Sequence, residues 1–266
     1  MNGSTPRRRS APLVVLALVA SACSTEPART SLRITAWGED YIEQGIPAEV
    51  LSDGWAISFD RFLVAIDAVD MEGTPLPGAF VVDLTQPSMG EGHALGEVLV
   101  PAEDHPHLSF EIHPVTEAQA ISASEDDRTQ LLDEGLSMLV EGEATRGGET
   151  IGFSWGFATS TRYHECHGAA DLADDPDPSS QLTIHADHLF YDDLDSEEPN
   201  VAFDLVASAD ADGDGEVTPA ELRAVDISTQ TRYQVGSRDI TDLWGFIETQ
   251  TGTVGHIDGE GHCAQR

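Results

Sequence analysis

Residues 55–66 read Trp55-Ala56-Ile57-Ser58-Phe59-Asp60-Arg61-Phe62-Leu63-Val64-Ala65-Ile66. The first half of this stretch alternates between apolar and small or polar side chains and runs into five consecutive apolar residues. Alternation with a period of two is typical of a β-strand. Asp53-Gly54 precedes the stretch and Glu72-Gly73 follows it. These pairs are turn signals, so the sequence predicts a strand between them.

Similar segments recur on both sides of this strand. Residues 31–37 (SLRITAW) alternate in the same way, and further short candidates lie next to glycine or proline. The further candidates are residues 79–84, 97–100, 107–113, 137–144 and 150–157. Only residues 126–134 look helical or loop-like, and residues 37–50 suggest a short acidic helix or loop. Strands at this spacing with few helices between them predict an antiparallel β-sandwich over residues 31–160, in a chain that is mainly β with a small α part.

The balance of charge restricts the partners of the chain. Its 266 residues include 48 acidic and 13 basic residues, all of the latter arginine, and the formal net charge is −35. Nucleic-acid binding is excluded because neutralising phosphates requires clustered basic side chains. A polybasic membrane contact is disfavoured for the same reason. Residues 161–266 form a second, more acidic region, and an acidic field of this kind attracts divalent cations.

The N-terminus carries an export pattern. Arg7, Arg8 and Arg9 precede an apolar run over residues 11–22 that is too short to span a bilayer comfortably, which predicts a signal peptide over residues 1–22. Residues 20–23 (ASAC) resemble the lipobox of bacterial lipoproteins. The resemblance implies a lipid on Cys23, cleavage before it, and a lipidated tether over residues 23–30. An ordinary secretory signal with a chance cysteine is the alternative.

Removal of residues 1–22 takes away three arginines and no acidic residue, so the mature chain would carry ten arginines, 48 acidic residues and a formal charge of −38. A lipid on Cys23 would hold the folded body at a membrane face. By analogy with lipoprotein sorting in Gram-negative bacteria, Ser24 in the position where aspartate would retain the protein favours the outer membrane. We therefore expect the periplasmic face or the surface of that membrane.

Two cysteines remain, Cys166 and Cys263. An even number of cysteines in an exported chain predicts a disulfide, which would close a loop of about 100 residues. The alternative is that Cys166, which lies between His164 and His167 with Glu165, is a thiolate ligand of a metal.

Residues 210–221 hold the most specific motif of the chain. They read Asp210-Ala211-Asp212-Gly213-Asp214-Gly215-Glu216-Val217-Thr218-Pro219-Ala220-Glu221. This stretch fits D-x-[DN]-x-[DN]-G-x5-E at every constrained position and resembles an EF-hand calcium loop. The resemblance implies calcium ligands from Asp210, Asp212, Asp214, the carbonyl of Glu216, Thr218 directly or through water, and a bidentate Glu221.

The flanks of the loop favour the same interpretation. Apolar residues recur at helical spacing before it, and Thr218-Pro219-Ala220-Glu221 is a capping box with proline at the first helical position. The sequence thus predicts a C-terminal helix–loop–helix subdomain. No second loop has the glycine and glutamate at the right offsets, so we expect one mainly structural calcium site, with a dissociation constant of about 10⁻⁵ to 10⁻³ M.

Histidines form the second candidate constellation. Six of the ten lie near the two cysteines, and the pairs His164/His167 and His185/His188 are each spaced i,i+3. The six are His164, His167, His185, His188, His256 and His262. Imidazoles suit copper or zinc, so a transition-metal-binding protein or a metal-dependent hydrolase is the alternative function. Hydrogen-bonding surface histidines are the simpler explanation of the same residues.

No nucleophile elbow, phosphate loop or dinucleotide fingerprint occurs in a plausible context, so the sequence gives no positive reason to expect an enzyme. Residues 37–43, 183–194 and 255–263 are similar to segments of an uncharacterised group of acidic lipoproteins from myxobacteria and their relatives. That resemblance implies export and a lipid anchor, and it implies nothing about chemistry. The sequence as a whole predicts a lipid-anchored, exported calcium-binding protein whose protein partners are unknown.

Overall fold

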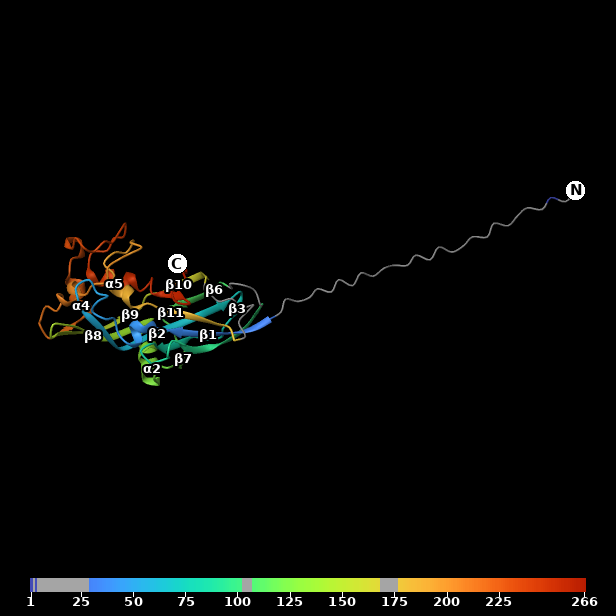
Figure 1. The fold of residues 1–266 in the computed structure, drawn as a ribbon, viewed down its shortest axis with the longest axis horizontal. Coiled ribbons are helices and arrows are strands. Elements are labelled where there is room, and N and C mark those ends of the chain that lie inside the picture. The colour runs from blue at the N-terminus through green and yellow to red at the C-terminus, as the bar shows by residue number, and fades with distance from the viewer. Residues whose placement is uncertain (2, 4–28, 102–106, 168–176) are drawn as a thin grey trace.

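The computed structural model describes residues 1, 3, 29–101, 107–167 and 177–266. Within them the chain is mainly β and forms two sheets in a sandwich-like arrangement, as predicted (Figure 1). The signal segment, apart from residues 1 and 3, and Cys23 with most of its tether lie outside the described residues. No helix in the described part of the chain has the length and apolar composition needed to cross a membrane.

The larger sheet contains ten strands in the order β12-β9-β8-β2-β6-β10-β14, and β3, β4 and β7 branch from this path. Its strands are β2 (Ala56–Met71), β3 (Thr74–Pro75), β4 (Phe80–Asp83), β6 (His107–Ile112), β7 (Gln119–Ile121), β8 (Met138–Arg146), β9 (Glu149–Phe157), β10 (Thr161–His167), β12 (Glu216–Val217) and β14 (Ala264–Gln265). Most neighbours are antiparallel, but β4/β7 and β12/β9 are parallel.

The smaller sheet has four strands in the order β13-β11-β1-β5. They are β1 (Arg29–Trp37), β5 (His93–Pro101), β11 (Ser179–Ile184) and β13 (Gly255–Ile257). The pair β1/β11 is parallel, whereas the other two pairs are antiparallel. Strands from the acidic C-terminal region therefore complete both sheets, and one continuous core contains residues from before and after position 160.

The long strand β2 is buried on both faces in its central part. Phe62, Val64 and Ile66 belong to the main core between the sheets. Leu63 and Ala65 belong to a second, smaller apolar cluster together with Leu131 of helix α2 (Glu125–Asp133). Because successive side chains of a strand point to opposite faces, the consecutive apolar residues supply both clusters at once.

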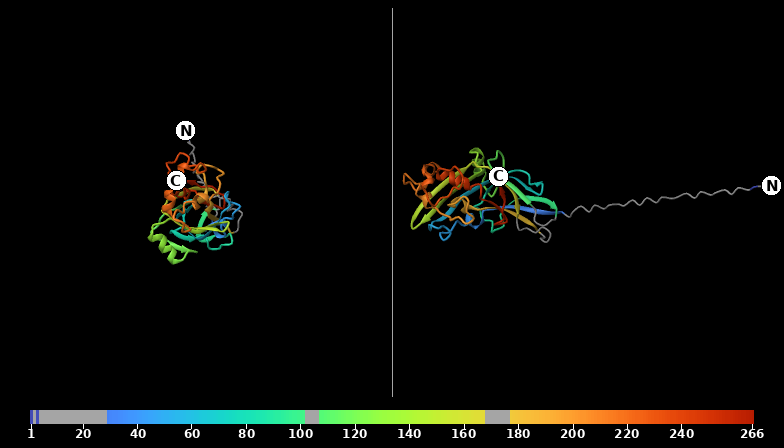
Figure 2. Two further views of the ribbon diagram at one scale, coloured as in Figure 1. Left: turned by 90° about the vertical axis from the view of Figure 1, so that its left-hand side faces the viewer. Right: turned by 90° about the horizontal axis from the view of Figure 1, so that it is seen from above.

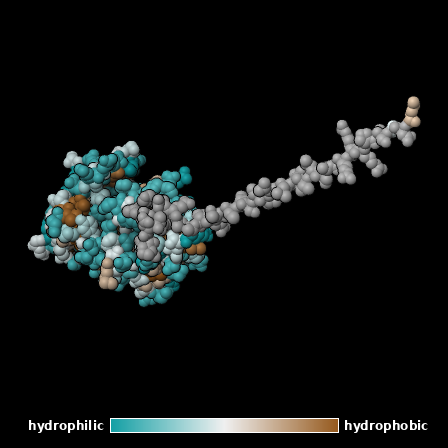
Figure 3. Space-filling view, turned by 45° about the vertical axis from the view of Figure 1, so that its right-hand side comes forward, coloured by the Kyte–Doolittle hydropathy of each residue, from teal (hydrophilic) through white to brown (hydrophobic). Residues whose placement is uncertain are grey.

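Short helices connect the strands and gather near the C-terminus. Besides α2, they are α1 (Glu39–Glu43), η1 (Ala186–Phe190), α3 (Asp204–Ala207), α4 (Pro219–Ala224), η2 (Ile227–Thr229) and α5 (Leu243–Gln250). The orange and red helices of the C-terminal part lie at one end of the molecule (Figure 2). On the face drawn in Figure 3, the described surface is mostly hydrophilic, as the acidic composition leads one to expect.

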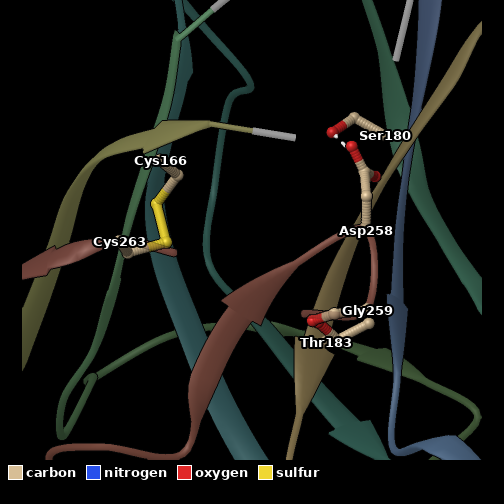
Figure 4. Close-up of a disulfide and its surroundings, with 6 residues drawn as sticks. All are labelled: Cys166, Ser180, Thr183, Asp258, Gly259 and Cys263. Carbon is tan, nitrogen blue, oxygen red and sulfur yellow. Dashed lines mark hydrogen bonds between the residues drawn. A yellow bond between two sulfur atoms is a disulfide. The ribbon is translucent and has the colours of Figure 1, made fainter. Parts of the chain in front are cut away.

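Cys166 and Cys263 form a disulfide, which confirms the predicted pairing (Figure 4). Cys166 is fully buried in β10, and Cys263 directly precedes β14. The bridge therefore fastens the C-terminal end of the chain to the larger sheet. A sulfur atom bonded in this way is not a thiolate, so Cys166 is not available as a metal ligand in this state, contrary to the alternative that the sequence left open.

Arg61 of β2 links three elements. Its Nε donates to Glu141 of β8 at 2.5 Å, and its Nη1 donates to Asp127 and Gln130 of α2 at 2.8 and 3.0 Å. The hydrogen bond from Arg61 lowers the pKa of Glu141. Burial opposes the charge of Asp127, but hydrogen bonds from Ser124 and Arg61 outweigh it and lower that pKa as well.

We expect loss of the disulfide to destabilise the protein strongly. The bridge joins residues 97 apart, and a loop of about 100 residues corresponds to about 4.7 kcal/mol of lost unfolded-state entropy, an upper value. Denaturant unfolding of Cys166→Ala/Cys263→Ala should give a lower midpoint than the wild type. The wild type in reductant should approach the variant, and the variant should not respond to reductant. Equal midpoints for all samples would contradict the expectation.

We also expect the contribution of Glu141 to depend on pH. Because its pKa is lower in the folded state than the ordinary 4.5, its stabilisation is present above that value and is lost as the pH falls through the folded pKa. Glu141→Gln should therefore lose less stability than the wild type between about pH 5 and pH 3. At neutral pH the coupling to Arg61 in a double-mutant cycle should be about 0.5 to 1 kcal/mol.

Glu125→Gln is the matched control for Glu141→Gln. Glu125 pairs with Arg128 within α2, and its side chain is 74% exposed. Solvent screens such a pair, so this variant should follow the pH profile of the wild type. A profile of Glu141→Gln that coincides with both would refute the role of the Arg61 contact.

Candidate metal centres

Two groups of side chains in the described residues bring potential metal ligands together. One is the acidic loop, where carboxylate oxygens of Asp210, Asp212 and Asp214 lie within 4.8 Å of one another. The other is a histidine cluster, where ligand atoms of His185, Asp187 and His188 meet the same limit. The first offers only oxygen, whereas the second offers nitrogen and oxygen, so the two groups differ in the metals that they suit.

The acidic loop is folded by hydrogen bonds from its own backbone. Asp210 accepts from the amides of Gly213 and Gly215, at 2.8 and 3.0 Å, and Asp214 accepts from the amide of Glu216 at 2.9 Å. Gly213 and Gly215 both have positive φ angles, which an L side chain rarely adopts. The glycines thus permit the tight turn that brings the aspartates together. Asp212 and Asp214 are exposed, so the group is open to solvent.

Glu221, the last residue of the loop motif, is engaged at the start of α4. Its Oε2 accepts from the amide and the hydroxyl of Thr218, at 2.9 and 2.8 Å, and its Oε1 accepts from the amide of Ala211 at 3.0 Å. The bond from the Thr218 backbone is the largest cause of the lowered pKa of Glu221. This is the predicted capping box, and it keeps Glu221 ionised close to the aspartates.

The loop is attached to the sandwich by its short strand. Strand β12 adds in parallel to the edge strand β9, with Val217 opposite Phe153. The amide of Gly152 donates to the carbonyl of Gly215 at 2.8 Å, and Trp155 Nε1 donates to the carbonyl of Val217 at 3.0 Å. Val217 is fully buried. The edge of the larger sheet therefore holds the second half of the acidic loop in place.

Helix α3, before the loop, is attached to the sandwich by charged groups. Asp53 accepts from the amides of Phe203 and Asp204 at 2.6 and 2.8 Å. The carboxylate of Asp204 accepts from Trp55 Nε1 at 3.1 Å and lies 2.6 Å from Arg146. Both flanks of the loop are therefore held, one against residues 53–55 and β8 and the other against β9. The helix is only four residues long, so the helix–loop–helix subdomain stays a prediction.

Three of the six candidate histidines lie together. The ring centroids of His185, His188 and His256 are 4.3 to 5.3 Å apart. His262 lies at the rim of this cluster, 6.1 Å from His256, and is exposed. His164 and His167 belong to β10, where the ring of His167 contacts that of His107 at 4.3 Å. Among residues 29–101, 107–167 and 177–266, no ring contact joins His164 or His167 to the three clustered imidazoles.

The backbone explains why these three converge. His256 of β13 lies opposite Thr183 of β11, and His185 follows Thr183 by two residues, so both imidazoles lie on one side of the sheet. His185 then precedes the 3₁₀ helix η1, and His188 lies within it. Side chains three residues apart eclipse in a 3₁₀ helix, which brings His188 back over His185.

Charged and polar groups surround the cluster. Glu39 lies 3.6 Å from His185 Nε2, and Tyr191 donates to Asp187 Oδ2 at 2.9 Å. Burial and the neighbouring His185 lower the pKa of His188 to about 3. The same two causes lower the pKa of His256 to about 4. Both imidazoles are therefore neutral at physiological pH and have a lone pair free for a metal.

Burial raises the pKa values of Glu39 and Asp187, although His185 opposes the shift in both. Neither residue was among the candidates from the sequence. The stretches that contain them, residues 37–43 and 183–194, stand out in the sequence only because they resemble segments of the acidic lipoproteins. Glu39 has no recognisable pattern of metal ligands around it in the sequence, because its neighbour in space, His185, lies far along the chain, just after β11.

Comparison of the chain with known protein families, with curated proteins and with solved structures finds no match. Conclusions about function therefore depend on the residues themselves and on the geometry described above.

Proposed function

We propose that the protein is an exported, lipid-anchored calcium-binding protein in which the ion occupies the acidic loop of residues 210–221. The observation that carries the proposal is the approach of three aspartate carboxylates to within 4.8 Å in a loop that fits the EF-hand pattern at each constrained position. Calcium prefers six to eight oxygen ligands, and this loop offers carboxylate, carbonyl and hydroxyl oxygens at the required spacing.

The role of calcium in this proposal is structural. The loop carries a dense negative charge, and a bound cation would relieve the repulsion among its carboxylates. Because β12 is paired with β9 and Val217 is buried, a rigid loop would fasten the C-terminal helices to the sandwich. A single loop on a sheet edge does not resemble the paired sensor loops that expose a groove on binding calcium.

Calcium should raise the melting temperature of the wild-type protein. With a dissociation constant of about 10⁻⁴ M, 10 mM calcium is about 100 times that constant and stabilises by about 2.7 kcal/mol. For a chain of this size the melting temperature should then rise by about 5 to 10 °C. Asp210→Asn and Glu221→Gln should abolish most of this rise, measured by calorimetry in chelator and in calcium.

Glu216→Gln is the control for this experiment. Glu216 is exposed and is expected to bind through its backbone carbonyl, so loss of its side-chain charge should leave most of the shift intact. A wild-type melting temperature that calcium does not change would reject the site. An equal shift in Asp210→Asn would place the bound calcium elsewhere.

The lipid anchor is the second part of the proposal and is supported by residues 7–23 alone. Cys23→Ser should remove the acylation site, so the protein should move from the membrane fraction to the soluble fraction of the exporting cell. Metabolic labelling with palmitate and fractionation measure the two effects. Continued labelling of the variant, or an unlabelled wild type, would contradict a lipid on Cys23.

A further inference from the structure

We propose that the protein also binds one divalent transition-metal ion, of the zinc class, between His185, His188, His256 and Asp187. This site lies apart from the acidic loop in sequence and differs from it in ligand chemistry, so the inference goes beyond the proposed calcium function. Ligand atoms of His185, Asp187 and His188 lie within 4.8 Å of one another, and the ring of His256 adds a fourth group with its centroid 4.3 Å from that of His185. Three imidazoles and one carboxylate make up a ligand set that zinc accepts in tetrahedral geometry. Calcium prefers oxygen ligands alone, and the two groups of side chains should therefore take different ions.

Hydrogen bonds around the cluster fix which nitrogen of His188 is free. Its Nδ1 lies 3.0 Å from Thr253 Oγ1, and that hydroxyl donates to the carbonyl of Gln250 at 2.9 Å. Thr253 has thus used its only hydrogen and accepts from His188 Nδ1–H. This assignment leaves the Nε2 of His188 unprotonated and able to bind a metal.

His185 is oriented in a similar way. Its Nε2 lies 3.3 Å from the carbonyl of Gly259 and 3.6 Å from the carboxylate of Glu39, and both of these groups are acceptors. The proton therefore belongs on Nε2, and Nδ1 keeps its lone pair. A histidine that donates its second nitrogen to a carboxylate or a carbonyl is the usual arrangement around protein-bound metals. Glu39 is a positioning residue in this scheme.

Two atoms of the cluster are buried and lack a hydrogen-bond partner in the described structure, namely Asp187 Oδ1 and His256 Nδ1. The other carboxylate oxygen of Asp187 is held by Tyr191. A buried polar atom without a partner is destabilising, so such atoms are rare unless something binds them. A metal ion would satisfy Asp187 Oδ1, and it would satisfy His256 Nδ1 in the tautomer that carries the ring proton on Nε2.

Backbone geometry at Glu39 points to the same place. Glu39 has a φ angle of 56°, which is uncommon for a residue with a side chain. It begins α1 and is separated from the end of β1 by Gly38, and β1 is paired in parallel with β11, so the ends of the two strands bring Glu39 and His185 together. The turn at Asp258-Gly259 is bonded to β11, where the amide of Gln181 donates to Asp258 and the hydroxyl of Thr183 donates to the carbonyl of Gly259. Figure 4 shows Thr183 beside Gly259. Rigid elements thus hold the ligands on three sides.

Titration of the full chain, purified in detergent, with zinc chloride in 5 mM calcium chloride tests the proposal. Calcium keeps oxygen-only sites filled, and the wild type should bind one equivalent of zinc. His188→Gln and His256→Gln should each weaken zinc binding by at least about 100-fold, whereas Glu39→Gln should weaken it by about 10-fold. His164→Gln is the matched control and should bind like the wild type, because its imidazole lies on β10.

Two further measurements separate the outcomes. Cobalt in place of zinc in the wild type should give the visible spectrum of a tetrahedral site with nitrogen ligands, a readout that does not depend on the folding of any variant. Asp210→Asn should bind zinc normally, so failure of the calcium proposal would leave this result unchanged. The proposal is overturned if the wild type binds no zinc, if His188→Gln and His256→Gln bind it as tightly as His164→Gln does, or if cobalt gives only an octahedral spectrum.

Discussion

Strand β1 pairs in parallel with β11, from Arg33 opposite Ser179 to Trp37 opposite Thr183, and this pairing joins the first described strand to the last third of the chain. Without it the smaller sheet would separate into two pairs of strands, β1 with β5 and β11 with β13. Leu32, Ile34 and Ala36 of β1 are fully buried in the main core, so the same pairing supplies one wall of the sandwich. Because parallel neighbours end at the same edge, it also fixes Glu39 and His185 beside each other.

Charge sets a second constraint on this fold, since the chain has no lysine and few arginines to offset its acidic residues. Several of those arginines lie where elements meet. Arg61 connects β2, β8 and α2, while Arg146 of β8 reaches Asp204 of α3. Arg232 bonds both to the buried Asp192 and to Ser52. In the two candidate metal centres a cation would complement carboxylates that no arginine of the described residues contacts.

Local features of the fold could be predicted from the sequence, because they depend on neighbours along the chain. The alternation in residues 55–66, the acidic helix at α1 and the capping box of Thr218 and Glu221 are of this kind. Helix α5 also has a local signal, since Asp242 caps it through the amide of Gly245. The parallel pairs β1/β11 and β12/β9 join segments far apart in the chain, and periodicity within a segment carries no information about them.

The two histidine pairs illustrate the same limit, because both have the spacing i,i+3 but differ in local backbone. His164 and His167 belong to strand β10 of the larger sheet, where a bulge between Tyr163 and Cys166 interrupts the alternation of faces.

His185 and His188 flank and enter a 3₁₀ turn, where they eclipse. Spacing alone therefore could not separate the pair that joins a cluster from the pair that does not. Convergence with His256 depends in addition on the register of β11 against β13.

Glu221 has two roles that compete within the proposed calcium loop. As the third residue of α4 it accepts hydrogen bonds from Thr218, and its other oxygen accepts from the amide of Ala211. As the last residue of a calcium loop it would turn both oxygens toward the ion. Each hydrogen bond weakened in that exchange subtracts about 0.5 to 1.5 kcal/mol from the free energy of binding.

That loss favours a calcium affinity at the weak end of the range for such loops, which suits the structural role proposed for the ion. The anchoring of β12 on β9 points the same way, because a loop fixed to a sheet edge has little freedom to rearrange when the ion binds.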